Sequence, residues 1–417
     1  MLIEFTVENY LSIKEPMTLS MIATSDNTLQ ENIIERENYR LVKSAAIYGS
    51  NASGKSNVLK ALKYMRELIL ESHQNQRGDK TSVIPFKLDQ ETMNKPSKFE
   101  IIFIHDKIKY IYGFAVDSDK VVNEYLYSYQ FNRKKTIFER GMKIPFYCTA
   151  DRTKQNIIYE TTLDNILYLS KATQSNYKPV HGAFDWFGNT LKCVLTDLQI
   201  PVNRFLGYTA FEISRNPAAK IKALNFLHEA DIGIDDIITA LNEEQVFDEE
   251  KNETVTQKII DIKTKHIGRK SNKETYEVIF DLAEESSGTI RFLGLLGPII
   301  DVIENGYVLV YDELDIILHP MLSRFIIKLF HSQNTNPHNA QLIFNSHDST
   351  LLDNELFRRD QIWFTEKKND GSTDLYSLSD FKPRKPRKKD NFQKHYIEGR
   401  YGAIPYIGKA LFLSDKG

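Results

Sequence analysis

Cysteine is scarce in this sequence of 417 residues, which contains only Cys148 and Cys193. Two cysteines cannot build a disulfide framework or a four-cysteine zinc site within one chain, and their scarcity fits a reducing compartment. An excess of charge of one sign is also missing, because 54 Lys and Arg residues stand against 56 Asp and Glu residues. The formal net charge of -2 argues against a protein that coats nucleic acid with its whole surface, and leaves room for a local basic patch.

Long apolar runs are missing as well. The most apolar stretch, residues 292–303, contains Asp301 and is too short to span a bilayer. The first residues, MLIEFTVENYL, place Glu4 and Glu8 where a signal peptide needs an uncharged apolar core. We therefore expect a cytoplasmic globular protein without membrane contact. At about 150 residues for a typical domain, the length predicts two to three domains, or one large domain with an insertion.

The first third of the chain has the patterns of strands and of one helix. Alternating or continuous apolar residues predict strands at 2–8, 15–23 and 44–48, and short β-type runs separated by polar turns predict an antiparallel meander over 98–131. The segment 56–72 has apolar residues at the spacing of one helix face. The apolar residues of that face are Val58, Leu62, Met65 and Ile69.

The middle of the chain changes character. Residues 218–227 and 235–241 are helix-like, and strand patterning returns at 254–264 and 274–282. This change predicts a split domain. Its parts are an N-terminal lobe of residues 1–165, a mainly helical insertion of residues 166–249, and a C-terminal lobe of residues 250–417.

The C-terminal lobe combines a helix with two buried strands. The apolar pattern at 289–303 predicts a helix that Pro298 kinks or breaks, because proline lacks the N–H that a helix interior needs. Residues 307–311 and 341–344 are continuous apolar runs, which are typical of buried parallel strands. The whole pattern predicts an α/β fold with a mixed, largely parallel β core, an antiparallel meander and flanking helices.

One motif carries specific chemistry. Residues 49–56, GSNASGKS, fit the pattern G-x-x-x-x-G-K-[ST] completely, and the predicted strand and helix flank them. Backbone N–H groups of such a loop curl around phosphate, and the helix N-terminus adds partial positive charge. Lys55 is expected to reach the outer phosphates and the Ser56 hydroxyl to ligate Mg²⁺. The predicted nucleotide-binding residues are Gly49, Ser50, Asn51, Ala52, Ser53, Gly54, Lys55, Ser56 and Asn57.

A P-loop also needs a carboxylate at the end of a neighbouring buried strand. The apolar run 307–311 ends directly in Asp312 and Glu313. We predict that Asp312 holds Mg²⁺, directly or through water, and that Glu313 is the general base that polarises the attacking water. The alternative is a strand that ends in a charged turn, although two adjacent carboxylates there would be costly without a cation or solvent.

Three further features each allow two interpretations. Ser286 and Gly288 precede the predicted helix at 289–303, where a Ser-x-Gly either binds an anion or only caps the helix. His347 follows the strand at 341–344 and either senses a γ-phosphate or is structural. The run 382–389, KPRKPRKK, is either a solvated loop or a contact with a nucleic-acid phosphate backbone.

In this order, the motifs resemble the heads of ABC-type ATPases of the RecF and SMC kind. The turn at 9–12, Asn-Tyr-Leu-Ser, resembles the turn beside the adenine of these heads, and residues 312–320 resemble their DE-x-[DE]…LHP segment. The signature departs from LSGGQ, since only Ser286 and Gly288 match it. Its Ser-x-Gly-Thr form and the closing segment 360–408 are similar to RloA-like and AbiL-like abortive-infection ATPases and to the ATPase subunit of PARIS anti-phage systems.

This resemblance implies ATP and Mg²⁺ as cofactors and a homodimer as the working form. Two heads would sandwich ATP, so that the P-loop of one chain faces Ser286 and Gly288 of its partner, and hydrolysis would open the dimer. Related defence ATPases assemble into larger homo-oligomers. The implied partner is a separately encoded toxic effector, in this family often a nuclease of TOPRIM or RloB-like type. A phage protein or nucleic acid is the implied trigger.

Two other functions compete with this one. A RecF-like DNA-repair ATPase would carry a continuous basic groove, whereas this chain is near neutral with one basic run. A nuclease and ATPase in one chain, as in OLD proteins, is disfavoured because only 70 residues follow His347, against roughly 100 for a TOPRIM domain. The sequence therefore favours an ATPase sensor and scaffold in antiviral defence. The Q-loop glutamine of such heads stays open among Gln74, Gln76 and Gln90.

Overall fold

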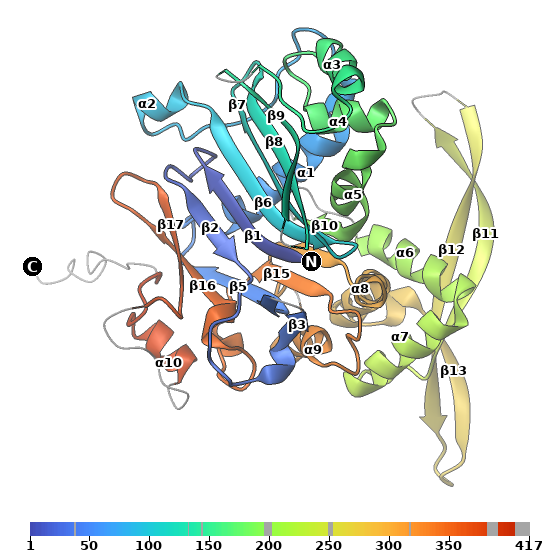
Figure 1. Ribbon diagram of the computed structural model, residues 1–417. Coiled ribbons are helices and arrows are strands. Elements are labelled where there is room, and N and C mark those ends of the chain that lie inside the picture. Colours follow the sequence, from blue (N-terminus) through green and yellow to red (C-terminus); the bar gives the residue numbers. More distant parts are fainter. Residues whose placement is uncertain are drawn as a thin grey trace, which may run out of the picture. The chain divides into compact units, whose positions relative to one another are not determined.

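The chain folds into two compact units, which are described separately (Figure 1). Unit 1 comprises residues 1–195, 306–314 and 330–417, and unit 2 comprises residues 196–305 and 315–329. The computed structural model describes residues 1–36, 39–131, 133–142, 145–195, 202–248, 253–316, 318–381 and 391–404. The basic run 382–389 and the end of the closing segment, from residue 405, lie outside these described residues.

The first sheet of unit 1 is antiparallel and has the strand order β2-β1-β6-β7-β8-β9. Its strands are β1 (Leu2–Glu8), β2 (Met17–Ser20), β6 (Ser97–His105), β7 (Ile108–Val116), β8 (Val121–Gln130) and β9 (Arg133–Gly141). The strands predicted at 2–8 and 15–23 and the meander over 98–131 are confirmed. The last strand, β9, extends the meander beyond the predicted range.

The second sheet of unit 1 has the order β10-β14-β15-β5-β16-β17 and is parallel except for its last pair. Its strands are β5 (Ser44–Gly49), β10 (Leu191–Val194), β14 (Val308–Tyr311), β15 (Gln341–Asn345), β16 (Ile362–Lys367) and β17 (Thr373–Ser377). The predicted buried parallel strands at 307–311 and 341–344 are confirmed. Parallel strands direct their carboxyl ends to one edge, so the segments after β5, β14 and β15 meet there.

Helix α1 (Lys55–Glu71) connects the two sheets of unit 1. Its predicted apolar face, from Val58 to Ile69, is buried in one cluster with Phe99 and Phe114 of the meander and with Val310 of the parallel sheet. Each fully buried aliphatic side chain stabilises the fold by about 1.5–3 kcal/mol. This packing fixes the N-terminus of α1 relative to the strand ends. The other helices of unit 1 are α2 (Gln90–Met93), α3 (Arg152–Glu160), α4 (Tyr168–Gln174), α5 (His181–Asp185) and α10 (Phe392–Ile397).

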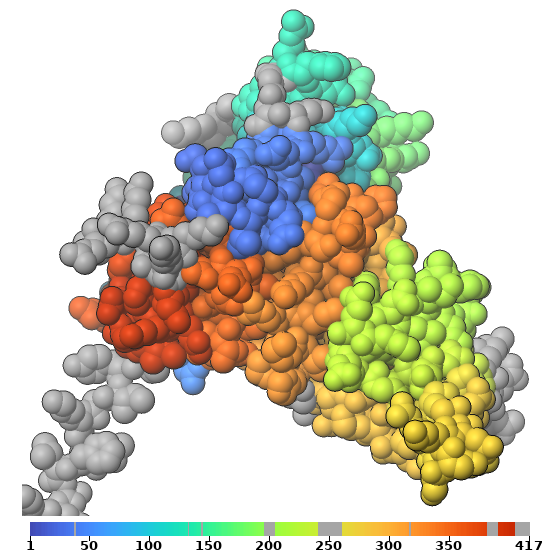
Figure 2. Space-filling model, turned by 90° about the horizontal axis from the view of Figure 1, so that it is seen from below, coloured from blue at the N-terminus to red at the C-terminus, as the bar shows by residue number. Residues whose placement is uncertain are grey.

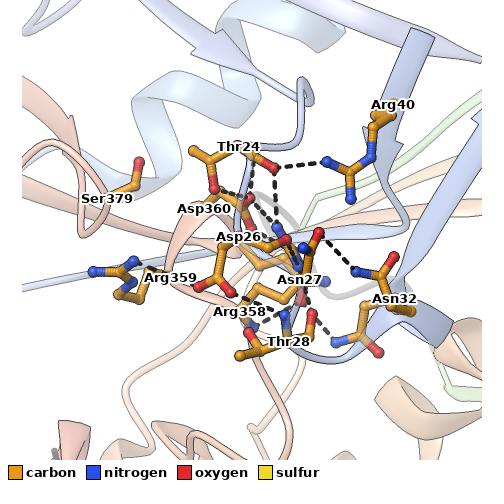
Figure 3. A network of polar contacts seen from close by, with 12 residues as sticks. Thr24, Asp26, Asn27, Thr28, Asn32, Arg40, Arg358, Arg359, Asp360 and Ser379 are labelled. Carbon is orange, nitrogen blue, oxygen red and sulfur yellow. Dashed lines mark hydrogen bonds and ion pairs between the residues drawn. The ribbon is translucent and has the colours of Figure 1, made fainter. Parts of the chain in front are cut away.

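A buried network joins the N-terminal segment of unit 1 to the parallel sheet, next to the hairpin of β3 (Ile33–Arg36) and β4 (Tyr39–Val42) (Figure 3). The Arg358 guanidinium donates to both carboxylate oxygens of Asp360, at 2.9 and 2.7 Å, and to the Asp26 carbonyl at 2.8 Å. Asp360 in turn accepts from the backbone N–H and the hydroxyl of Thr24. Because both charged groups are buried, losing either partner would cost about 3–5 kcal/mol.

The described part of unit 2 contains helices and an antiparallel sheet of order β11-β12-β13. Figure 2 shows residues 205–229 of this unit, in yellow-green, next to residues of its sheet that are drawn in yellow. The bounds of these helices and strands are α6 (Val202–Arg215), α7 (Pro217–Glu229), α8 (Ser287–Asn305), β11 (Asp236–Asp248), β12 (Glu253–Arg269) and β13 (Thr275–Asp281). A further helix, α9 (Pro320–His331), begins in unit 2 and ends in unit 1. Among the described residues, no helix has the length and apolar character needed to cross a bilayer.

The predicted mainly helical insertion of residues 166–249 is not confirmed. Residues 166–195 belong to unit 1, and the helix predicted at 235–241 is wrong, because β11 begins at Asp236. The apolar residues Ile237, Ile238 and Leu241 fit one helix face, but β11 pairs with β12 over its whole length. Long-range pairing therefore overrides the local pattern. The strands predicted at 254–264 and 274–282 are confirmed as β12 and β13.

Helix α8 continues through Pro298, so the predicted break does not occur. Proline at this position leaves the carbonyl of Gly294 without its usual helical donor. Thr209 of α6 replaces that donor, because its hydroxyl donates to the Gly294 carbonyl at 2.7 Å and accepts from the Gly297 N–H at 3.0 Å. A side-chain hydroxyl from the neighbouring helix thus provides the hydrogen bond that the Gly294 carbonyl loses because of Pro298.

Candidate nucleotide site

The loop of residues 49–56 follows β5 and leads directly into α1, as the motif predicts. Gly54 has a φ of 104°, and a Cβ there would overlap the Thr373 side chain on β17. A Cβ on Gly49 would overlap the Thr365 carbonyl oxygen on β16. Both glycines are therefore required by the path of the loop against the sheet edge, in addition to any contact with phosphate.

The loop presents donors that fit a phosphate group. Among the described residues, no side chain caps the N-terminus of α1 at Gly54, and the partial positive charge of such a helix end favours an anion. Lys55 is buried at the same place, where its Nζ donates to the carbonyls of Gly49 and Ser50 at 2.8 and 3.1 Å. Ser53 is also buried, and its hydroxyl shares a hydrogen bond of 2.6 Å with that of Thr365. Asn51 and Ala52 are exposed at the loop's tip.

Ser56 and Asp312, the predicted metal ligands, lie together although they are 256 positions apart in the sequence. The Ser56 hydroxyl donates to Oδ1 of Asp312 at 2.9 Å, and Asp312 is only 3% exposed. The sheet order brings them together, because β14, which ends before Asp312, is separated from β5 only by β15. A hydroxyl and a carboxylate are hard oxygen ligands, and they fit Mg²⁺.

Asn345 at the end of β15 joins Ser56, Asp312 and Glu313 through hydrogen bonds. This residue was not among those predicted from the sequence. Its Nδ2 donates to Oδ1 of Asp312 at 2.5 Å and to the Ser56 hydroxyl at 3.2 Å. Its Oδ1 accepts the backbone N–H of Glu313 at 2.5 Å. One buried amide thus fixes both predicted metal ligands and the backbone of the predicted base. The available signal was a polar residue that ends a continuous apolar run.

Glu313 and His347 complete this edge of the sheet. Glu313 is half-buried and has a φ of 59°, a left-handed conformation that is costly for a residue with a side chain. Such backbone strain concentrates at functional sites, where the surrounding structure fixes it. The Asn345 amide supplies that fixation here, since it binds the Glu313 N–H. His347 lies two residues beyond Asn345 and is exposed.

The turn at residues 9–12, which the resemblance predicts to lie beside the adenine, lies beside the P-loop. The Asn57 side chain donates to the Ser12 hydroxyl at 2.6 Å, and that hydroxyl also contacts Oγ1 of Thr373 at 2.7 Å. Asn9 has a φ of 55° and holds the turn in place, because its Nδ2 donates to the carbonyls of Thr92 and Lys95, both at 2.8 Å. The side chain of Asn57, predicted as a nucleotide ligand, therefore serves to attach this turn to α1.

The signature residues Ser286 and Gly288 belong to unit 2, whereas the P-loop and Asp312 belong to unit 1. Ser286 caps α8, since its hydroxyl accepts the Thr289 N–H at 3.1 Å, and it is exposed. A Cβ added to Gly288 would meet, among the described residues, only the Ser286 hydroxyl oxygen within 4 Å, at 3.8 Å. The preceding Glu285 is held by the hydroxyl of Thr264 and by Nε2 of His266, the latter at 2.7 Å. Ser286 therefore caps α8 in this structure, and its exposed side chain leaves its predicted role as an anion site a prediction.

At the opposite end of β5, away from the P-loop, Lys43, Ser44 and His331 form a second, buried group of polar contacts. The Lys43 ammonium donates to the His331 carbonyl at 2.7 Å, and burial lowers the pKa of Lys43 to about 8. Burial also lowers the pKa of His331 to about 3, so its ring is neutral and bonds the Ser44 hydroxyl at 2.7 Å. These contacts anchor the strand that leads to the P-loop.

The fold and this site define a P-loop ATPase domain with a mixed α/β architecture. Residues 44–353 match the model of the family described as "AAA domain, putative AbiEii toxin, Type IV TA system". This match covers more than half of the chain, and the protein belongs to that family of nucleotide-binding ATPases linked to abortive infection or toxin systems. No curated protein matches the chain.

Proposed function

We propose that the chain hydrolyses ATP with Mg²⁺ at the site between β5, β14 and β15. Lys55 and the backbone N–H groups of the P-loop would bind the outer phosphates, and Ser56 and Asp312 would hold the metal. When bound, Mg²⁺ would neutralise the charge that develops on the phosphates. The bridge formed by Asn345 between Ser56, Asp312 and the Glu313 backbone is the observation that carries this proposal.

Glu313 would accept a proton from the attacking water. Asn345 binds the backbone N–H of Glu313, and Ser56 binds the neighbouring Asp312. These two bonds fix the position of the Glu313 backbone from which its carboxylate extends. His347 would sense the γ-phosphate. A Glu313→Gln variant keeps the shape and loses the base, and we expect it to bind ATP normally with turnover lowered about 300-fold. Turnover at the wild-type rate would exclude Glu313 as the base.

We further propose that this ATPase is the sensor and scaffold subunit of a bacterial anti-phage system of the RloA-like and AbiL-like kind, similar to the ATPase subunit of PARIS systems. It would act in the cytoplasm and hold a separately encoded effector, a TOPRIM or RloB-like nuclease, until a phage protein or nucleic acid appears. The order of motifs and the abortive-infection family support this role. Two chains would sandwich ATP between the P-loop of one and Ser286 and Gly288 of the other, as a homodimer or within a larger homo-oligomer.

Co-expression with the neighbouring genes tests the scaffold role. The tagged ATPase is purified with each neighbour in turn, from wild-type and Glu313→Gln chains. We expect one neighbour to co-purify in a fixed ratio and to be released from the wild-type chain upon ATP turnover, but retained by Glu313→Gln. Recovery of the ATPase alone, in every combination and nucleotide state, would contradict the scaffold role and leave the ATPase proposal standing.

The second candidate is a RecF-like or SMC-like ATPase that binds DNA directly in repair or recombination. The basic run 382–389 favours it, since six basic residues in eight suit a phosphate backbone. Under this function, duplex DNA should raise the ATPase rate, and deletion of residues 382–389 should remove that stimulation. A rate that duplex DNA leaves unchanged would speak against it.

A further inference from the structure

A groove of about 570 Å³ lies in unit 1 at the end of the antiparallel sheet where β1 begins. The turn between β6 and β7, the end of β8 and the hairpin of β3 and β4 surround it. The Asn9–Ser12 turn beside the P-loop follows the other end of β1, so seven residues of extended strand, about 23 Å, separate the two places. The groove is therefore distinct from the nucleotide site. Its lining includes Arg36, Tyr39, Lys107, Lys109, Tyr129 and Phe131.

Positive charge dominates the groove. Among the described residues that line it, Arg36, Lys107 and Lys109 are cationic and Asp106 is acidic. Burial, and to a smaller extent the nearby Arg36 charge, lower the pKa of the Met1 amino group at the start of β1 to about 5. On the adjoining strand β9, residues 133–135 add three exposed basic side chains. The net charge of this region is opposite to that of the chain as a whole.

Aromatic rings alternate with these cations. The Lys109 ammonium lies 4.3 Å from the centroid of the Tyr129 ring and 5.8 Å from that of Tyr39. The Lys134 ammonium lies 3.4 Å from the Tyr127 centroid on the same sheet. Each contact holds a cation at a fixed place above a π-face, at a stabilisation of about 0.5–1 kcal/mol at an exposed site.

Phe131 is the most informative residue of the groove. It is 99% exposed and has a φ of 46° in the turn after β8. Hydration of a whole phenyl ring is unfavourable, and the left-handed backbone adds a conformational cost. A fully exposed ring next to lysines is the arrangement with which proteins stack an unpaired base while cations contact the phosphates.

We propose that this groove binds single-stranded nucleic acid, with phosphates against Arg36, Lys107 and Lys109 and a base stacked on Phe131. The groove has the volume of a small-ligand site, which suits one or two nucleotides and is too small for a duplex. An acidic peptide would satisfy the cations and leave the ring exposed, so the nucleic-acid strand is the better complement. The site would let the protein sense unpaired DNA or RNA independently of its ATP site.

Fluorescence anisotropy of the full chain with a labelled twelve-nucleotide oligo-dT measures this binding directly. We expect Phe131→Ala to weaken binding about ten-fold, because stacking is lost. Lys107→Gln should lower the slope of log K against log salt by about 0.7, the value for one phosphate contact on a single strand. Met142→Ala removes another exposed apolar side chain, Lys178→Gln removes another exposed lysine of unit 1, and both controls should bind as the wild type does.

Two further measurements separate this groove from other sources of binding. A chain without residues 382–389 should retain the Phe131 effect, whereas loss of all binding on that deletion would assign the strand to the basic run and overturn the proposal. Duplex DNA and polyglutamate should compete at least ten-fold more weakly than oligo-dT. Equal competition by either one would overturn it too, as would equal affinities of Phe131→Ala and wild type. Thermal unfolding of each variant should match the wild type, since both side chains are exposed.

Discussion

The P-loop side and the signature side of the proposed ATP site differ in how their residues are held. On the P-loop side, Ser56, Asp312 and Asn345 come from segments far apart in the sequence and bond one another within a buried sheet edge. On the signature side, Ser286 is exposed, and its hydroxyl bonds Thr289 in the first turn of its own helix. The P-loop side is therefore preorganised by the fold, and the signature side is a capped, exposed helix N-terminus.

This difference indicates that ATP hydrolysis, and not ATP binding, needs a second chain. Preorganised donors bind without reorganisation, so unit 1 should bind ATP in a single chain. A capped, exposed helix end is not a catalytic site by itself, yet it can meet a phosphate held by another copy. We therefore expect binding to follow the P-loop side and turnover to require both sides. The following predictions test that division.

The largest effect is expected for Lys55→Ala. The variant removes the buried ammonium that the P-loop carbonyls hold, and ATP binding should weaken about a thousand-fold, as for a truncated buried charge contact. Titration with a fluorescent ATP analogue measures the affinity. The control Lys63→Ala removes a lysine of the same helix that pairs with Glu67, and its affinity should match the wild type. Unchanged affinity of Lys55→Ala would refute the P-loop assignment.

A smaller effect, on turnover alone, is expected for Ser286→Asp. Aspartate caps a helix as well as serine does, so the stability of α8 should be retained. Its charge would oppose a phosphate contributed by the partner, which costs several kcal/mol, and turnover should fall about 100-fold with ATP binding unchanged. Steady-state hydrolysis and ATP titration separate the two effects. Normal turnover would mean that Ser286 is only a cap.

The next smaller effect, a weaker affinity for Mg²⁺, is expected for Asn345→Leu. The substitution keeps the volume and removes the bonds to Ser56, Asp312 and the Glu313 N–H. Loss of such supporting bonds weakens metal binding by about 10–100-fold, and we expect a shift of about ten-fold in the Mg²⁺ concentration for half-maximal turnover. Asn94→Ala, an exposed site, is the control. An unchanged Mg²⁺ dependence would remove Asn345 from the positioning of the ligands.

The smallest effect on activity is expected for Thr209→Val, which acts on the helix that carries the signature. Valine has the same shape but leaves the Gly294 carbonyl beside Pro298 without a donor. The free energy of unfolding should fall by about 1–3 kcal/mol. Denaturant titration measures it, with the exposed Thr275→Val of β13 as the control in the same unit. A loss no larger than that of the control would show that α8 tolerates Pro298 without Thr209.

The local motifs were readable from the sequence because each is contiguous. The motif at residues 49–56 and the pair Asp312 and Glu313 each lie within a few positions, and the sheet order then places them together. The polar end of the apolar run marks Asn345 in the sequence, but its bridging role could not be predicted, since that role depends on β15 lying between β14 and β5. The same reason explains the wrong helix at 235–241, whose strand pairing with β12 is a long-range contact. Contacts between distant segments, such as Thr209 with Gly294, leave no local pattern.

Complementation between two inactive chains tests most directly whether the ATP site is completed in trans. Lys55→Ala and Ser286→Asp chains are co-expressed with different tags, and the mixed dimer is purified. In that dimer one site combines both defects, and the other combines an intact P-loop with an intact Ser286 from its partner. We expect turnover of about half the wild-type rate per dimer, since one of two equivalent sites works. Turnover no higher than that of either variant alone would contradict it.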